Sequence, residues 1–204
     1  MPGAHYSLSE LAIVVVALVA ARDLFRKNRG LAAAGTAILG LAAAIGVVRF
    51  ANGEVDALAA IHKLVSQAGG ASAMGLIALQ LAKLTGLAEN PPRPLIGALA
   101  VLATVVVALA NPALATPLFL FWLLAATLLA ARLPARAAWQ RWLRSAAVGS
   151  FVLNVLLVRQ SLVLGPDLSW HLFHVLVALW LFALWRVFAG MIELELTDRS
   201  GSPA

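Results

Sequence analysis

Two histidines near the start of a long apolar segment are the first candidates for chemistry in this sequence. His171 and His174 lie in the segment 165–186, which begins with a Gly-Pro turn and then runs apolar for about 20 residues, enough for a helix to cross a bilayer. At i,i+3 spacing the two imidazoles share one face of that helix. Because ionisable side chains inside a membrane span are costly, the pair predicts a functional site.

A third histidine is expected at a similar depth. His62 follows Gly53 by about nine residues and His174 follows Pro166 by eight, which places both roughly 12–13 Å below the outer ends of their helices at 1.5 Å per residue. Asn154 is expected at a depth of about 15 Å by the same rise. His62, His171 and His174 therefore predict a zinc site that leaves a fourth position for water. Zinc there would lower the pKa of the bound water and make a hydroxide nucleophile.

Two alternatives use the same residues differently. In the first, a haem b takes one axial ligand from His62 and the other from His174, while Arg49 and Arg159 hold the propionates. In the second, the chain is a non-catalytic membrane protein, either a subunit of a larger complex or a ligand-binding protein. Glu10, near the start of the first apolar segment, is expected to pair with an arginine rather than do chemistry.

The composition is that of an integral membrane protein. Of 204 residues, 62% are hydrophobic and 12% charged, whereas a soluble domain has about 25% charged residues. The mean hydropathy is +0.93. The absence of cysteine excludes disulfides, thiolate ligands and iron–sulfur clusters. The net charge of +6 is attributed to basic residues in short loops beside spans, so a nucleic-acid partner is not expected.

The hydrophobic pattern predicts an all-α membrane protein, a bundle of seven transmembrane helices. The expected spans are residues 8–24, 31–50, 55–84, 94–110, 113–131, 145–164 and 165–191. Basic residues are concentrated in the loops after the first, third and fifth spans, which predicts an outer N-terminus and a cytoplasmic C-terminus. Residues 1–192 are expected to form one domain, followed by a short polar cytoplasmic tail at 193–204.

Parts of the chain resemble the alkaline ceramidase and adiponectin-receptor superfamily of seven-span membrane hydrolases. The stretch WHLFHVLVALWLFALW at 170–185 looks like the last span of bacterial ceramidase-like members. The start, SELAIVVVALVAARDLFRK, and AAAIGVVRF at the end of the second span look like a bacterial branch of similar proteins. The resemblance implies a zinc-dependent hydrolase acting on a lipid amide or ester from the outer half of the bilayer, in the bacterial inner membrane.

The same resemblance implies roles for individual residues. An aspartate and a serine assist the three zinc-binding histidines in that superfamily, and Asp167 and Ser66 are their counterparts here. The family's last-span histidines are usually spaced i,i+4, which puts Trp170 at the other position if His174 is one of them. Relatives commonly have a histidine near the end of the second span, where this chain has Arg49. The expected partners are the lipid bilayer, a lipid substrate, and a membrane-protein partner or a second copy of the chain.

Overall fold

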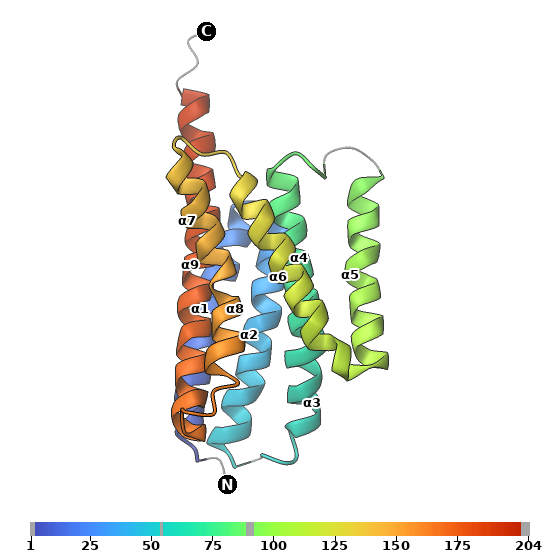
Figure 1. Cartoon of the computed structure of the whole chain (residues 1–204), viewed down its shortest axis with the longest axis vertical. Helices are drawn as coiled ribbons and strands as arrows, with labels where there is room; N and C mark the ends of the chain where they lie inside the picture. Colours follow the sequence, from blue (N-terminus) through green and yellow to red (C-terminus); the bar gives the residue numbers. More distant parts are fainter. Residues whose placement is uncertain (1–2, 54, 89–91, 201–204) are drawn as a thin grey trace.

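The computed structural model describes residues 3–53, 55–88 and 92–200, with side chains as far as Met191. That part of the chain contains helices and no strand (Figure 1). The α-helices are α1 (Tyr6–Arg26), α2 (Gly30–Ala51), α3 (Ala59–Leu64), α4 (Gly70–Leu84), α5 (Arg93–Ala110), α6 (Ala115–Arg132), α7 (Ala138–Gly149), α8 (Phe151–Leu153) and α9 (Pro166–Ser200). Three short segments of other helix types join them, namely η1 (Val65–Gly69), η2 (Pro112–Leu114) and η3 (Asn154–Val158).

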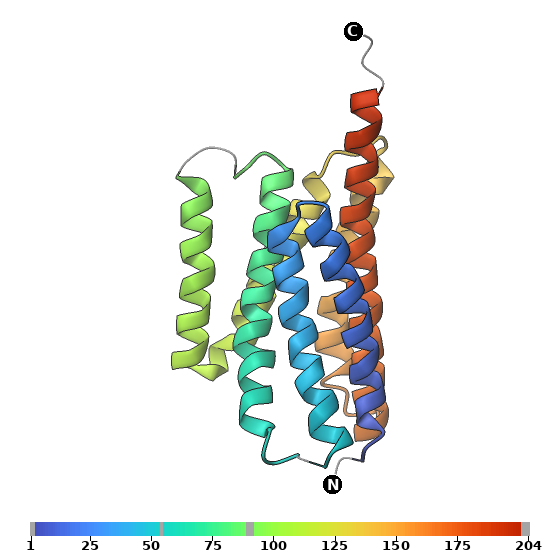
Figure 2. The ribbon, with the colours of Figure 1, turned by 180° about the vertical axis from the view of Figure 1, so that it is seen from behind.

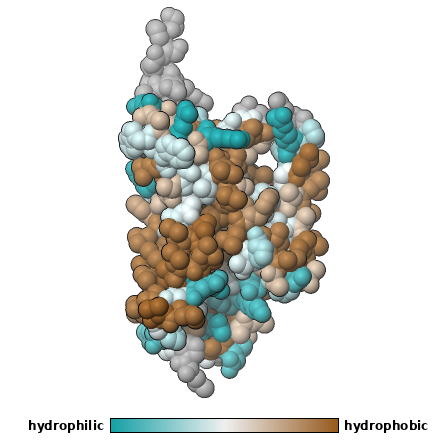
Figure 3. Space-filling view, in the orientation of Figure 1, coloured by the Kyte–Doolittle hydropathy of each residue, from teal (hydrophilic) through white to brown (hydrophobic). Residues whose placement is uncertain are grey.

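Six helical segments are long and apolar enough to cross a membrane, which confirms the prediction of an all-α membrane protein. They are Gly30–Ala51, Ala59–Leu84, Arg93–Ala110, Pro112–Arg132, Ala138–Val158 and Pro166–Met191. In the space-filling view, hydrophobic residues form a band across the middle of the visible face, and hydrophilic residues gather nearer its ends (Figure 3). The protein therefore presents the apolar girdle of an integral membrane protein.

The segment before α9 differs most from its predicted boundaries. The expected span at 145–164 is replaced by α7, α8 and η3, which together cover Ala138–Val158. The helix begins earlier because Trp139, Arg141 and Trp142, expected in a loop, form its first turns, where aromatic and basic side chains suit the membrane interface. It ends earlier because the chain must turn before Gly165 and Pro166, and proline starts α9 rather than continuing a helix.

The helices pack as a bundle in which small residues allow close approach. α1 lies along α2 and α9, and α4 lies between α2 and α6, while α5 stands at the edge (Figures 1 and 2). At Gly35 in α2, an added Cβ would lie 2.6 Å from the carbonyl oxygen of Ala73 in α4, so only glycine permits this contact. Such small-residue contacts are typical of helix packing in membranes.

Two π-helical segments, η1 and η3, lie on opposite sides of one cavity. π-helices are rare overall, but those that occur are often found at functional sites. Side chains also tie η3 to α9, since Asn154 Nδ2 donates to the carbonyl oxygen of Phe173 at 3.0 Å and Ser169 Oγ donates to that of Val158 at 2.7 Å. These two hydrogen bonds hold the η3 wall of the cavity against α9.

Candidate functional site

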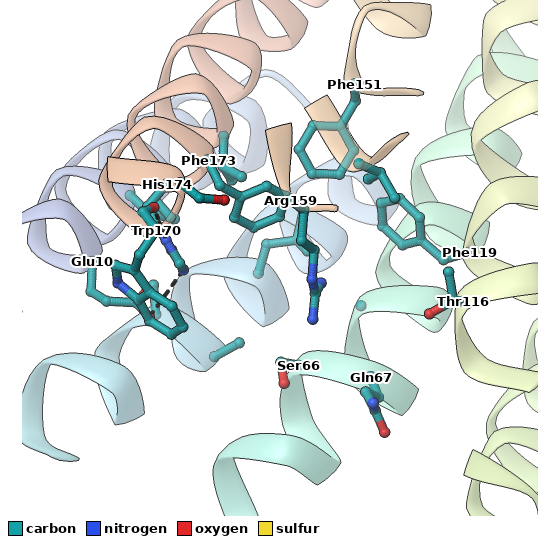
Figure 4. A pocket seen from close by; sticks show the side chains of 18 of the residues that line it. Glu10, Ser66, Gln67, Thr116, Phe119, Phe151, Arg159, Trp170, Phe173 and His174 are labelled. Carbon is teal, nitrogen blue, oxygen red and sulfur yellow. Dashed lines mark hydrogen bonds and ion pairs between the residues drawn. The ribbon is translucent and has the colours of Figure 1, made fainter. Parts of the chain in front are cut away.

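The cavity has a volume of about 520 Å³, and several polar and ionisable side chains that could take part in a reaction line it (Figure 4). Its apolar wall comes from α1, α2, α6, α8, η3 and α9 and consists of Ile13, Leu39, Ala42, Ala43, Ala115, Phe119, Phe151, Val155, Phe173 and Val177. Its polar lining comes from Glu10, His62, Ser66, Gln67, Thr116, Arg159, Ser161, Ser169, Trp170 and His174. An apolar cavity of this size with a few convergent polar groups is the usual form of a small-molecule site.

Glu10 is the central group of the site. It is only 2% exposed, and its Oε1 atom makes no hydrogen bond within the described residues. That oxygen lies 3.3 Å from Nε2 of His174 and 3.9 Å from Nε2 of His62. Gly46 of α2 makes room for the carboxyl group, because a Cβ at that position would lie 2.6 Å from Oε1. The first, second, third and last long helical segments thus meet at one carboxylate.

The hydrogen bond at the other nitrogen of His174 sets the proton on its ring. Nδ1 lies 2.7 Å from the carbonyl oxygen of Trp170, which can only accept, so Nδ1 carries a proton. In the neutral imidazole, Nε2 is then a bare lone pair facing the Glu10 carboxyl. A carboxylate and a lone pair at 3.3 Å repel each other unless one proton lies between them. Glu10 and His174 therefore lie as a carboxyl–imidazole pair, with room for one proton between Oε1 and Nε2.

Arg49 sets the tautomer of His62 in the opposite sense. Its Nη1 lies 3.4 Å from Nδ1 of His62, and its Nε donates to the carbonyl oxygen of Val55 at 2.6 Å. An arginine is always a donor, so Nδ1 of His62 accepts, and its proton is on Nε2. That N–H points to Glu10 from 3.9 Å, too far for a hydrogen bond but close enough to stabilise a negative carboxyl group.

His171, predicted as a zinc ligand, belongs to a different cluster at the N-terminal ends of α1 and α9. Its ring stacks on Tyr6 with 5.3 Å between centroids, and Nδ1 lies 3.1 Å from Ser9 Oγ. The Tyr6 hydroxyl donates to Asp167, which is not among the residues that line the cavity. The structure therefore places His171 and Asp167 in an interhelical contact, whereas His62 and His174 meet at Glu10.

The remaining predicted site residues lie around the cavity. Ser66 lines it, and its hydroxyl donates to the carbonyl oxygen of His62 at 2.6 Å, as expected for a serine inside a helix. Arg159 points towards the middle of the cavity, between Phe173 and Ser66 (Figure 4). Its guanidinium carbon lies 5.3 Å from the centroid of the Phe173 ring.

These residues do not fit the predicted zinc site. In residues 3–53, 55–88 and 92–200, no group of three or more His, Cys, Asp or Glu side chains is placed to hold a metal ion. A zinc-bound imidazole needs a bare ligating nitrogen and an acceptor for its other N–H. His174 meets the second condition, but at His62 the donor Arg49 stands where an acceptor is needed. The guanidinium would also repel a divalent cation.

The haem b alternative stays a prediction. Glu10 Oε1 lies within 4 Å of Nε2 of both proposed ligands, His62 and His174. Of the two predicted propionate partners, Arg49 is already bonded to Val55 and His62.

The sequence did not predict that Glu10 lies beside His62 and His174, because it was expected to pair with an arginine. The available signal was an acidic residue in an apolar segment, one of few charges expected in the outer half of the bilayer. It also missed Trp170, whose buried indole N–H has no hydrogen-bond partner within the described residues. The Trp170 ring packs on His174 with 4.3 Å between centroids and so fixes that imidazole in place.

Comparisons of the chain with protein-family models, with curated proteins and with solved structures give no match.

Proposed function

We propose that α1 is a seventh span, which places the N-terminus outside and the C-terminus in the cytoplasm of a bacterial inner membrane. The 21 residues of α1 extend roughly 30 Å, the thickness of the hydrocarbon core. The basic residues after α1, α4 and α6 then share one side of the membrane, as the positive-inside rule requires. In that orientation the cavity opens in the outer half of the bilayer.

We further propose that the chain is a metal-independent hydrolase that cleaves an ester or amide bond of a lipid. The observation that carries this proposal is the buried Glu10 carboxyl group paired with His174 at a cavity with an apolar wall. An acid buried inside a membrane is rare because of its desolvation cost, and by default it indicates a functional site. The resemblance at both ends of the chain to seven-span lipid hydrolases supports the reaction class without requiring their zinc site.

In the proposed reaction, the Glu10–His174 pair first accepts a proton from water and later donates a proton to the leaving group. A water molecule in the cavity gives a proton to the Glu10 carboxyl group while the proton between the pair passes to Nε2 of His174, and the water oxygen attacks the carbonyl carbon of the substrate. The pair then returns that proton to the leaving alcohol or amine as the bond between it and the carbonyl carbon breaks. His62, whose Nε2–H faces the carboxyl group, stabilises Glu10 whenever it is negative. The products are a carboxylic acid and an alcohol or amine.

A lipid panel tests this function. Purified protein, dialysed against a chelator, is incubated with acyl esters and acyl amides in mixed micelles, and released fatty acid is measured by mass spectrometry. We expect release by the wild type and its loss in His174→Gln. The matched control is His171→Gln, which changes the same residue type one turn earlier in α9 but outside the cavity, and should keep the activity. Release that requires added zinc would refute the metal-independent mechanism, and no release from any substrate would favour a non-catalytic binding protein.

A further inference from the structure

Arg159 lies at the end of an apolar helical segment. It follows directly after η3, and the segment Ala138–Val158 ends one residue before it. Its guanidinium nevertheless turns into the cavity (Figure 4). In the proposed orientation this end of the span lies at the headgroups of the outer leaflet, and the side chain lines the same cavity as Glu10.

The guanidinium has no counter-ion in the part of the chain that the structure describes. It lies over the face of the Phe173 ring, with 5.3 Å between the ring centroid and the guanidinium carbon. An arginine presents several N–H donors in a plane that matches two oxygens of a phosphate or carboxylate group. Neutral donors and acceptors are also available in the lining, at Gln67, Thr116 and Ser161. The cavity mouth thus has an unused site for an oxyanion.

The charges of the cavity give a bound molecule one orientation. An anionic head is attracted to Arg159 and repelled by the Glu10 carboxyl group, which lies in the buried part of the cavity. The neutral ester or amide bond then faces Glu10 and His174, and the chain lies on the apolar wall. A cavity of about 520 Å³ is within the usual range for small-molecule sites, so it holds a head, its linkage and the first part of one chain.

We infer that the substrate class is a lipid with an anionic, phosphate-bearing head, which Arg159 binds at the mouth of the cavity. This inference rests on the proposed function in that it takes the cavity as the lipid site. It assigns to Arg159 a role in substrate selection, separate from the chemistry at Glu10 and His174.

Binding measurements in a neutral detergent test the inference without turnover. The probes are a lysophosphatidic acid and a monoacylglycerol with the same acyl chain, which differ only in the phosphate, and inorganic phosphate as a competitor. The protein is full-length and carries Glu10→Gln to prevent hydrolysis, alone or with Arg159→Gln or Arg159→Lys. Arg141→Gln is the matched control, because Arg141 is an exposed arginine in α7 that does not line the cavity.

We expect the phosphate-bearing lipid to bind about tenfold more tightly than the neutral one, as for a charge-assisted hydrogen bond. Arg159→Gln should remove that preference, Arg159→Lys should keep part of it, and Arg141→Gln should keep all of it. Equal binding of both lipids by the parent protein, or a preference that survives Arg159→Gln, would overturn the inference. Competition by inorganic phosphate at the lipid's own affinity would also overturn it, since the site would then recognise an anion alone. Selective binding without hydrolysis by the protein with native Glu10 would leave the inference standing and refute the proposed function.

Discussion

Replacing Glu10 with glutamine separates the chemical role of the carboxyl group from its structural role. Glutamine has the same shape, so it still fits against Gly46. Its NH₂, in the place of Oε1, can donate to Nε2 of His174 at 3.3 Å. The N–H of His62, at 3.9 Å, is too far to bond the carboxyl group in the wild type and so loses no hydrogen bond. We expect the free energy of unfolding to change by less than about 1.5 kcal/mol, as for other volume-conserving changes.

The catalytic effect of the same change should be much larger. General acid–base catalysis contributes about 10²–10⁴-fold to rate, which corresponds to roughly 3–5 kcal/mol of activation free energy. Glu10→Gln should therefore lower lipid hydrolysis by at least about a hundredfold while the thermal unfolding curve in detergent stays close to that of the wild type. Glu10→Ala, in contrast, removes a buried partner of two histidines and should destabilise the fold by about 3–5 kcal/mol.

Both assays use the same detergent preparation, with fatty-acid release for activity and intrinsic fluorescence for unfolding. A Glu10→Gln protein that keeps wild-type activity would refute the acid–base role of the pair. One that unfolds as readily as Glu10→Ala would refute the proton assignment at His174, because the amide would then fail to donate to its Nε2.

Three further changes test the surroundings of the pair. Gly46→Ala places a methyl group 2.6 Å from Glu10 Oε1, so activity should fall and the free energy of unfolding should drop by about 1–3 kcal/mol. The control is Gly190→Ala, whose new Cβ has nothing within 4 Å, and it should be neutral or slightly stabilising in thermal unfolding. Asn154→Ala removes the hydrogen bond to α9 and should cost about 1 kcal/mol in the same assay, and an unchanged curve would deny that bond a role. Arg49→Gln removes the cation beside His62, so zinc measured by calorimetry should bind this variant more tightly than the wild type, and equal affinity would contradict the argument against a metal.

The layer of polar groups could be predicted from the sequence, because helix rise converts residue number into depth. His62 and His174 were expected at one level, and both lie at Glu10. His171 was assigned to the same site, but three residues leave two side chains about 60° apart around a helix and one turn apart along it. Consecutive residues of α1 then take different partners, so that Ser9 meets His171 and Glu10 meets His174.

The proton positions and the choice of partners could not be predicted, because they depend on contacts between distant segments. The tautomer of His62 follows from Arg49, at the end of another helix, and the room for the Glu10 carboxyl group follows from a glycine in α2. The sequence shows that each of these residues is present but not which of them meet. The early start of the span Ala138–Val158 was missed for a related reason, since tryptophan and arginine at the membrane interface suit a loop and a helix equally.

Nitrogen-15 NMR of histidine-labelled protein in lipid bilayers tests the central claim most directly, since it reads the protonation of each ring nitrogen without a substrate. With signals assigned by His174→Gln and His62→Gln, the account predicts a protonated Nδ1 on His174 and an Nε2 whose shift shows a proton shared with Glu10. It also predicts that Glu10→Gln moves this Nε2 signal to that of a neutral, hydrogen-bonded nitrogen. An Nε2 signal that is unchanged by Glu10→Gln, or that shows a bound metal, would contradict the claim that Glu10 and His174 form the acid–base pair of this protein.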